Sequence, residues 1–196
     1  MNNISVVNEQ NSILVSHLSK SFGEKKVLDD LSLSFPYEKI TCIMGKSGCG
    51  KTTLLNILLG IEKQDSGTVT GIPKKVSAVF QEDRLCEDFK VITNIKMATG
   101  RPENEILSCL SGLMMKESAN TKVKELSGGM KRRVAIARAL LSEHDLLIMD
   151  EPMKGLDTET RKKTASLIRE TAGTMIIVTH DEAEAELLGA GIIRLS

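Results

Sequence analysis

The sequence has no excess of either charge and no long apolar run. Its 196 residues include 26 Lys and Arg against 26 Asp and Glu, so the formal net charge is zero. A balanced charge gives no indication of a polyanion such as nucleic acid as the main partner. No apolar run reaches the roughly 18 residues that a membrane-spanning helix needs. Residues 1–13 have neither a basic start nor an apolar centre, so we expect no secretory signal there.

Cysteine is also scarce. The four cysteines, Cys42, Cys49, Cys86 and Cys109, form no CxxC pair and have no histidine cluster beside them. This spacing argues against a disulfide framework and a metal site, and favours reduced thiols in a cytosolic protein. With 41% hydrophobic and 27% charged residues, the composition is typical of a soluble globular protein. The length suits one domain with a proper core.

Four short apolar runs predict strands that are buried on both faces of a parallel sheet. Ligands of open α/β sheets bind at the carboxyl ends of the strands, so the polar residues that follow these runs are predicted to share one site. The runs are Ile40–Met44, Val76–Phe80, Leu146–Met149 and Thr174–Thr179, followed in turn by a glycine loop from Gly45, by Gln81, by Asp150 and Glu151, and by His180.

The remaining segments predict helices and an antiparallel unit. Apolar residues recur at helical spacing between the glycine loop and Gly60, in 130–141 and in 160–171. The first forty residues partly alternate between apolar and polar, as strands with one exposed face do. The weaker pattern of 83–124 indicates a mostly helical insertion. We therefore predict an α/β fold with a mostly parallel core sheet, a small N-terminal antiparallel β subdomain and an inserted helical subdomain.

The glycine loop "GKSGCGKT" matches the phosphate-loop pattern GxxxxGK[ST] between a strand and a helix. Glycines let backbone N–H groups turn towards phosphates, Lys51 reaches the β and γ oxygens, and the Thr52 hydroxyl is placed to bind Mg²⁺. A plain glycine turn is the alternative. The candidate phosphate-binding residues are Gly45, Lys46, Ser47, Gly48, Cys49, Gly50, Lys51, Thr52 and Thr53.

The acid pair at the end of 146–149 suits hydrolysis of a bound phosphate. Asp150 fits the Mg²⁺-side carboxylate, acting through a water, and Glu151 fits a general base for an attacking water. Gln81 could sense Mg²⁺ and that water, and His180 could donate to a γ-phosphate oxygen. Alone, an acid pair is often a solvated turn or a helix cap, and a lone glutamine or histidine is usually structural.

A second glycine motif, Ser127-Gly128-Gly129, precedes a predicted helix and could bind a further anion. An ordinary helix N-cap is the alternative. A phosphate-loop kinase or small GTPase has no use for a second such motif, whereas two motifs make sense if each binds a different nucleotide.

Phe22 precedes the core and has two interpretations. The simpler one is packing in the core or on the surface. The functional one is a platform on which an adenine ring stacks.

In their order along the chain, these motifs resemble those of the nucleotide-binding subunit of ABC transporters, from about Ile13 to the C-terminus. "GKSGCGKT" resembles the Walker A loop, "LSGGM" the signature motif and "LLIMDEP" the Walker B strand. Gln81 resembles the Q-loop residue, His180 the switch histidine, and "GLD", which ends at Asp157, the D-loop. Met130 stands where glutamine is common, and Phe22 where tyrosine is more usual.

The resemblance implies a single ATPase domain of the phosphate-loop (P-loop) NTPase class with ATP and Mg²⁺ as cofactors. The ATP-binding core and β subdomain would comprise approximately 13–82 and 145–196, and the helical subdomain approximately 83–144. Two such domains form a head-to-tail dimer in which each signature motif closes over the ATP of the other. Asp157 would lie across that interface, and the implied Mg²⁺ ligands are Thr52, Gln81 and Asp150.

The resemblance also implies partners. These are a second nucleotide-binding domain, identical or a paralogue, a membrane permease contacted through 82–98, and an extracytoplasmic solute-binding protein, with no nucleic acid. The segments around these motifs resemble importers of nitrate, sulfonate and taurine. From the sequence we expect no fused membrane domain and no second nucleotide domain. We therefore expect a separate subunit on the cytoplasmic face of the cell membrane.

Two alternatives remain. One is a soluble ABC ATPase that serves an assembly complex such as iron–sulfur cluster biogenesis. The other is a phosphate-loop kinase or regulatory switch, for which the second glycine motif would be a coincidence. Given the zero net charge, the basic cluster Lys131-Arg132-Arg133 is interpreted as a solvated helix face rather than a lipid or nucleic-acid patch.

Overall fold

The computed structural model describes residues 11–171 and 173–195, so the expectation about a secretory signal falls mostly outside the described residues. The strands are β1 (Ser12–Phe22), β2 (Lys25–Pro36), β3 (Ile40–Gly45), β4 (Ser66–Thr70), β5 (Val76–Val79), β6 (Leu146–Asp150), β7 (Thr174–Val178) and β8 (Gly191–Leu195). The α-helices are α1 (Lys51–Leu58), α2 (Val91–Thr99), α3 (Glu103–Gly112), α4 (Gly128–Leu141), α5 (Thr158–Glu170) and α6 (Glu182–Leu188).

The core is a parallel sheet in the order β5-β6-β7-β3-β8. Side chains of β3, β6 and β7 alternate between two apolar clusters, one with α1 and one with α4, α5 and α6. Cys42 and Met44, for example, join the cluster of α4, while Ile43 joins that of α1. Because both faces of these strands are covered, their sequences are apolar throughout. The four predicted strands are confirmed.

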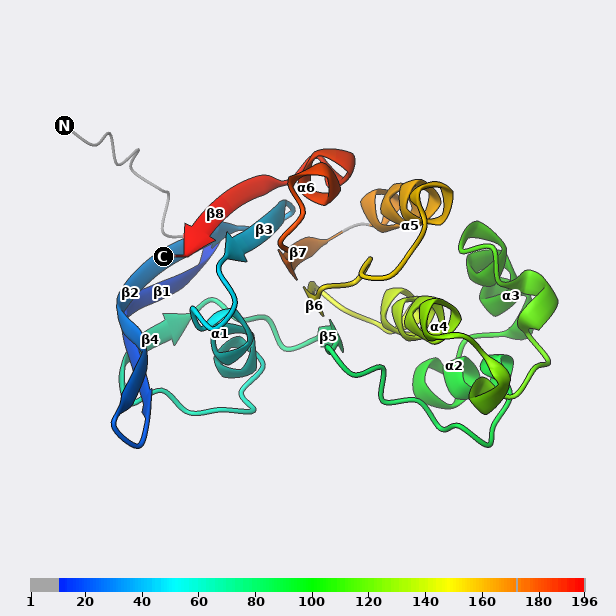
Figure 1. Ribbon diagram of the computed structural model, residues 1–196, viewed down its shortest axis with the longest axis horizontal. Helices are drawn as coiled ribbons and strands as arrows, with labels where there is room; N and C mark the ends of the chain where they lie inside the picture. The colour runs from blue at the N-terminus through cyan, green and yellow to red at the C-terminus, as the bar shows by residue number, and fades with distance from the viewer. Residues whose placement is uncertain (1–10, 172, 196) are drawn as a thin grey trace.

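A second sheet, in the order β2-β1-β4, is antiparallel and lies beside the core (Figure 1). The predicted β subdomain is confirmed, although the sequence analysis did not identify β4, β8 or α6. β4 is almost entirely exposed and β8 largely so, which leaves neither the alternation nor the apolar run that predicts a strand. At seven residues, α6 is too short for a clear helical period.

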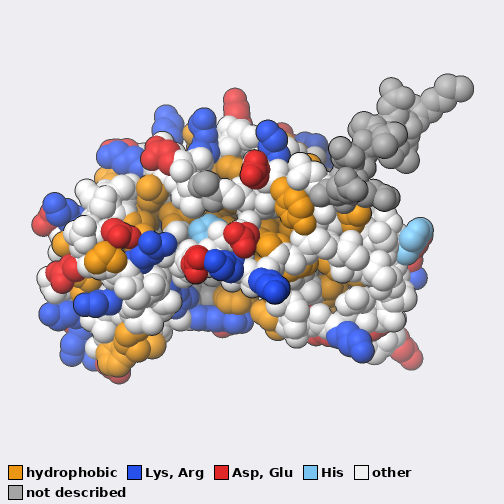
Figure 2. Space-filling view, turned by 180° about the vertical axis from the view of Figure 1, so that it is seen from behind, with side chains coloured by type: hydrophobic (Ala, Val, Ile, Leu, Met, Phe, Trp, Pro, Cys, Tyr) orange, Lys and Arg blue, Asp and Glu red, His pale blue; other side chains and the backbone are white. Residues whose placement is uncertain are grey.

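The opposite end of the molecule is helical (Figure 1). Helices α2, α3 and α4 pack around buried side chains such as Ile95, Leu110 and Val134. The predicted helical insertion is confirmed, and the subdomain boundaries given above stay predictions. In the described part of the chain, no helix is both long and apolar enough to cross a membrane. Figure 2 shows basic and acidic side chains intermingled on one face, as expected for zero net charge.

Candidate active site

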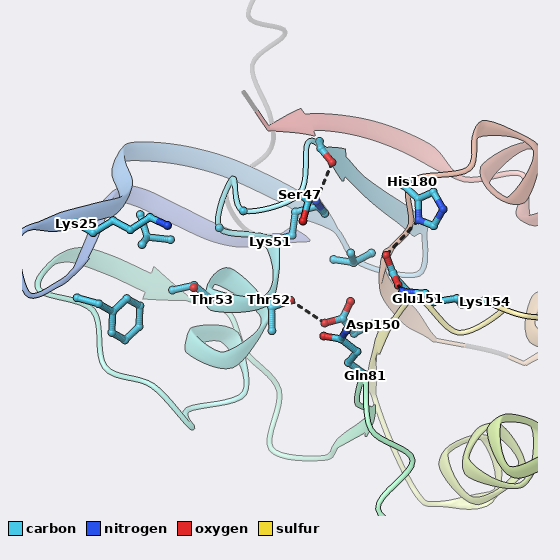
Figure 3. A pocket seen from close by; sticks show the side chains of 16 residues that line it. Lys25, Ser47, Lys51, Thr52, Thr53, Gln81, Asp150, Glu151, Lys154 and His180 are labelled. Carbon is cyan, nitrogen blue, oxygen red and sulfur yellow. Dashed lines mark hydrogen bonds and ion pairs between the residues drawn. The ribbon is translucent and has the colours of Figure 1, made fainter. Parts of the chain in front are cut away.

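One pocket lies at the carboxyl ends of β3, β5, β6 and β7, next to the antiparallel sheet (Figure 3). It brings together most of the predicted site residues. The predicted site residues that line the pocket are Phe22, Gly45, Ser47, Gly48, Gly50, Lys51, Thr52, Thr53, Gln81, Asp150, Glu151 and His180. The further lining residues are Lys25, Val27, Lys154 and Val178.

The glycine loop between β3 and α1 is packed so closely that two positions require glycine. A Cβ on Gly45 would lie 2.5 Å from the Leu195 carbonyl oxygen, and one on Gly50 would lie 2.6 Å from the Leu28 side chain. Gly50 also has a φ of 96°, which side chains disfavour. The hydrogen bond from Leu54 N to Gly50 O, 2.8 Å long, begins the α1 ladder. The amides of residues 51–53 therefore precede the helical bonds, as in an anion-binding helix start.

Lys51 holds its ammonium group at the mouth of this loop. Its Nζ donates to the carbonyl oxygens of Gly45 at 2.7 Å and Lys46 at 2.9 Å. A third contact, to Cys49 Sγ at 3.9 Å, is long and weak, so one of the three N–H donors can turn to an anion in the pocket. The side chains of Lys46 and Cys49 line an adjoining hollow near Glu182 instead.

A hydroxyl and a carboxylate meet at the centre of the pocket. Thr52 Oγ1 donates to Asp150 Oδ2 at 3.0 Å, and Gln81 lines the same space (Figure 3). Burial raises the pKa of Asp150, which is 6% exposed, although the hydrogen bond from Thr52 opposes this. Within the described residues, no group of three His, Cys, Asp or Glu side chains could form a metal cage. Two or three oxygen ligands fit Mg²⁺, which keeps waters and phosphate oxygens in its shell.

Glu151 is held at both carboxylate oxygens. His180 Nδ1 lies 3.1 Å from Oε1, and Lys154 Nζ donates to Oε2 at 2.5 Å. Burial raises the pKa of Glu151, but the hydrogen bonds from Lys154 and His180 outweigh it, so the pKa lies below its ordinary value. The carboxylate is therefore ionised and able to accept a proton. Its backbone has φ 47°, the kind of strained geometry that persists where surrounding contacts support it.

Lys154 was not among the predicted site residues. The signal available in the sequence was a lysine three positions after the candidate base, in "DEPMKGLD". That spacing does not by itself decide whether the side chain turns back to Glu151. The turn that follows β6 brings the two groups together.

The interpretation of the basic cluster was wrong for Arg132. This side chain is 6% exposed and donates to the carbonyl oxygens of Phe80, Asp150 and Glu151. Asp150 is the last residue of β6, and Phe80 and Glu151 lie just beyond β5 and β6, where carbonyls leave the sheet ladder and need other donors. The position of α4 brings Arg132 to these carbonyls. The residues next to Arg132 in the sequence do not indicate this contact.

The second glycine motif lies outside the pocket. Ser127 Oγ accepts a 3.3 Å hydrogen bond from Met130 N, so it caps α4, and Ser127 and Gly128 are exposed. Asp157 caps α5 by accepting from Thr160 Oγ1 at 2.6 Å and Thr160 N at 3.0 Å. Gly129 packs beside Gly155, so the two motifs are neighbours. None of these residues contributes to the pocket of its own chain.

The chain is similar to known transport proteins. Residues 28–154 match the protein family described as ABC transporter. Over 192 residues the chain is 38% identical to "Aliphatic sulfonates import ATP-binding protein SsuB 1" of Paracoccus denitrificans, covering 94% of this chain and 79% of the relative. It is 37% identical over 195 residues to "Aliphatic sulfonates import ATP-binding protein SsuB 3" of Pseudomonas syringae pv. tomato, covering 92% and 72%.

Two solved structures have the same fold. The dimeric structure of MJ0796, described as a bacterial ABC transporter cassette, matches with TM-score 0.83 and 29% identity, covering 93% of this chain and 94% of that one. The dimeric post-hydrolysis state of MJ0796 bound to ADP and Pi matches with TM-score 0.82 and 28% identity, covering 94% of each chain. Together with the pocket geometry, these similarities show that the chain belongs to the ABC transporter family, as an ATP-binding cassette that hydrolyses ATP.

Proposed function

We propose that this chain is the ATP-hydrolysing subunit of an importer for a small anionic solute, of which an organic sulfonate is the best-supported kind. The meeting of a phosphate loop, a hydroxyl–carboxylate pair and an ionised glutamate in one pocket carries the ATPase part. The relatives named as sulfonate import proteins support the solute, and favour an importer over an assembly-complex ATPase.

In this proposal each pocket residue has a role in hydrolysis. The loop amides and Lys51 bind the β and γ phosphates. Thr52, Asp150 and Gln81 would hold Mg²⁺, which supplies a Lewis acid that neutralises charge on the phosphate oxygens. Glu151 takes a proton from the attacking water, whose oxygen bonds to the γ phosphorus. The bond from that phosphorus to the β–γ bridging oxygen breaks, and ADP leaves with its electrons. His180 donates to a γ-phosphate oxygen.

The second glycine motif would act on the ATP of a second cassette. Ser127 and Gly128 are exposed at the start of a 14-residue helix and lie away from the pocket of their own chain. A helix start of this kind binds anions. In such a dimer Asp157, which is close to this motif, would lie at the interface. ATP would hold the two chains together until it is hydrolysed.

Replacing Ser127 with arginine should leave ATP binding to a single chain intact and block ATP-dependent dimer closure. The bulky cation would occupy the space that the partner's γ phosphate needs. Ultracentrifugation with and without ATP, together with ATP titration, measures both effects. Ser111→Arg, the same change at an exposed serine of α3, is the control. Normal hydrolysis by Ser127→Arg would exclude action on a second chain's ATP.

Phe22 would support the adenine ring. Its ring is 50% exposed, lines the pocket and has Lys20 Nζ 5.1 Å from its centroid. Stacking on an aromatic ring is worth ~1–3 kcal/mol per base, so Phe22→Ala should weaken ATP binding roughly tenfold. Phe22→Tyr should preserve the affinity, and Phe89→Ala at another exposed ring is the control. An unchanged dissociation constant for Phe22→Ala would assign the ring to packing alone.

The segment 82–98 would contact the permease. It carries the exposed apolar side chains Phe89 and Met97, 44% and 65% exposed. Buried Asn94 shapes this surface, accepting from Cys86 N at 2.8 Å and donating to Cys86 O at 3.0 Å. Docking on a permease would hold the chain at the cytoplasmic face of the membrane, in a complex that also includes an extracytoplasmic solute-binding protein.

The solute is tested by uptake. Cells in which this chain's gene is deleted should lose uptake of a radiolabelled alkanesulfonate, and the unaltered chain should restore it. The Lys51→Ala chain should not restore it, because transport depends on ATP. Uptake that is unchanged by the deletion would overturn the sulfonate assignment.

A further inference from the structure

Arg132 of α4 joins two segments of the active site that are distant in sequence. One guanidinium nitrogen, Nη2, donates to the carbonyl oxygens of Asp150 and Glu151, the latter at 2.9 Å. The other, Nη1, donates to the carbonyl oxygen of Phe80 and lies 3.0 Å from Asp83 Oδ1. This one side chain therefore contacts the backbone just before Gln81 and the backbone of Asp150 and Glu151.

The contacted carbonyls belong to the proposed catalytic residues or to a residue next to one. Phe80 precedes Gln81, and Asp150 and Glu151 are the acid pair itself. Glu151 has φ 47°, and its backbone is held by the bond from Arg132, by the 2.9 Å bond from its own N to Val178 O, and by a longer, 3.3 Å bond from Lys154 N to its carbonyl oxygen. Removing one of these three supports from a strained residue lets its side chain move away from the reacting water.

The planar guanidinium suits this task. Its five N–H donors form a rigid fork, so one side chain can hold two backbone segments at a set separation. A lysine ammonium at the same position is a compact charge on a flexible chain and would hold them less firmly. Buried surroundings make each bond to a carbonyl stronger, and an unpaired carbonyl more costly.

Arg132 also follows the second glycine motif on the same helix. It lies five positions after Ser127, which is about 7.5 Å along a helix axis. A shift of the start of α4 would therefore move the guanidinium against the carbonyls of Glu151 and Phe80. This gives the exposed motif a direct mechanical connection to the backbone of the general base.

We propose that Arg132 is a positioning residue that aligns Glu151 for hydrolysis according to the position of α4. The inference rests on the proposed function, in which Glu151 is the base and the start of α4 contacts a second nucleotide. Arg132 touches neither the nucleotide nor the water in this scheme.

The test compares Arg132→Met, Arg132→Gln and Arg132→Lys in the full chain. Arg132→Met should lower kcat about 10- to 100-fold, because small displacements of a catalytic group cost this much. The KM and the dissociation constant of a fluorescent ATP analogue should stay within about twofold. Arg132→Lys and Arg132→Gln keep N–H donors and should recover part of the loss. If the Arg132→Met chain does not fold, kcat and ATP affinity are compared in Arg132→Gln instead.

Two further variants separate positioning from general stability. Arg132→Met combined with Glu151→Gln should be no slower than Glu151→Gln alone, because a misplaced base and a missing base are one defect. Arg138→Gln is the matched control, since Arg138 of α4 donates to the carbonyls of Asp83 and Arg84 but not to the end of β6. It should keep its kcat.

Three results would overturn the inference. They are a normal kcat in a folded Arg132→Met or Arg132→Gln chain, an equal loss of ATP affinity and kcat, and an equal loss of kcat in Arg138→Gln. If Glu151→Gln itself hydrolyses ATP normally, the assigned base is wrong and the proposed function fails instead. The two failures are thereby distinguishable.

Discussion

Replacing Glu151 with glutamine should leave ATP binding intact and slow hydrolysis by about 10²- to 10⁴-fold, the usual contribution of a general base. The amide has the size of the carboxylate but cannot take a proton from water. The hydrogen bonds of Lys51 to the loop and of Thr52 to Asp150 do not involve Glu151, so the binding groups should stay in place.

The measurement is the hydrolysis rate together with the ATP dissociation constant and the solution mass. Light scattering should show a monomer without ATP and a dimer with it, because the variant cannot leave the closed state. Glu159→Gln, the same change in an exposed helical glutamate paired with Lys163, is the control and should retain activity. A hydrolysis rate within threefold of the unaltered chain would show that Glu151 is not the base.

A Glu151→Gln chain that stays monomeric with ATP leaves two explanations. Either closure needs the permease, or the second glycine motif does not act on another chain's ATP. Introducing Ser127→Arg into a reconstituted complex with the permease decides between them. Loss of hydrolysis there supports the former explanation, and retained hydrolysis supports the latter.

Replacing Lys51 with alanine should nearly abolish ATP binding. The ammonium supplies a charge-assisted hydrogen bond of roughly 1.5–3 kcal/mol to ATP, so losing it raises the dissociation constant about 10- to 100-fold. The loop also loses its internal contacts from Nζ to the carbonyls of Gly45 and Lys46. Both effects act in the same direction.

Calorimetric titration with ATP measures this loss, and the melting temperature without ATP shows whether the chain still folds. Lys74→Ala is the control, since this exposed lysine belongs neither to the loop nor to the pocket. Unchanged affinity in a folded Lys51→Ala chain would contradict the assignment of 45–52 as the phosphate loop.

Four of the five strands of the core sheet and most of the pocket could be predicted from the sequence. Strands covered on both faces must be apolar throughout, so β3, β6 and β7 are visible as runs. The glycine loop is equally visible, since close packing at Gly45 and Gly50 admits no other residue. Because parallel strands end at one edge, the sequence predicts that Gln81, Asp150, Glu151 and His180 share one site, and all four line the pocket.

Contacts between elements that are distant in sequence could not be predicted and are seen only in the folded chain. The burial of Arg132 depends on how α4 packs against the ends of β5 and β6, about fifty and twenty residues away along the chain. The contact of Lys154 with Glu151 depends on the path of one turn. The separation of Ser127 from its own pocket depends on where α4 begins in space. Such contacts arise from packing of elements, whereas sequence patterns record mainly local periodicity and burial.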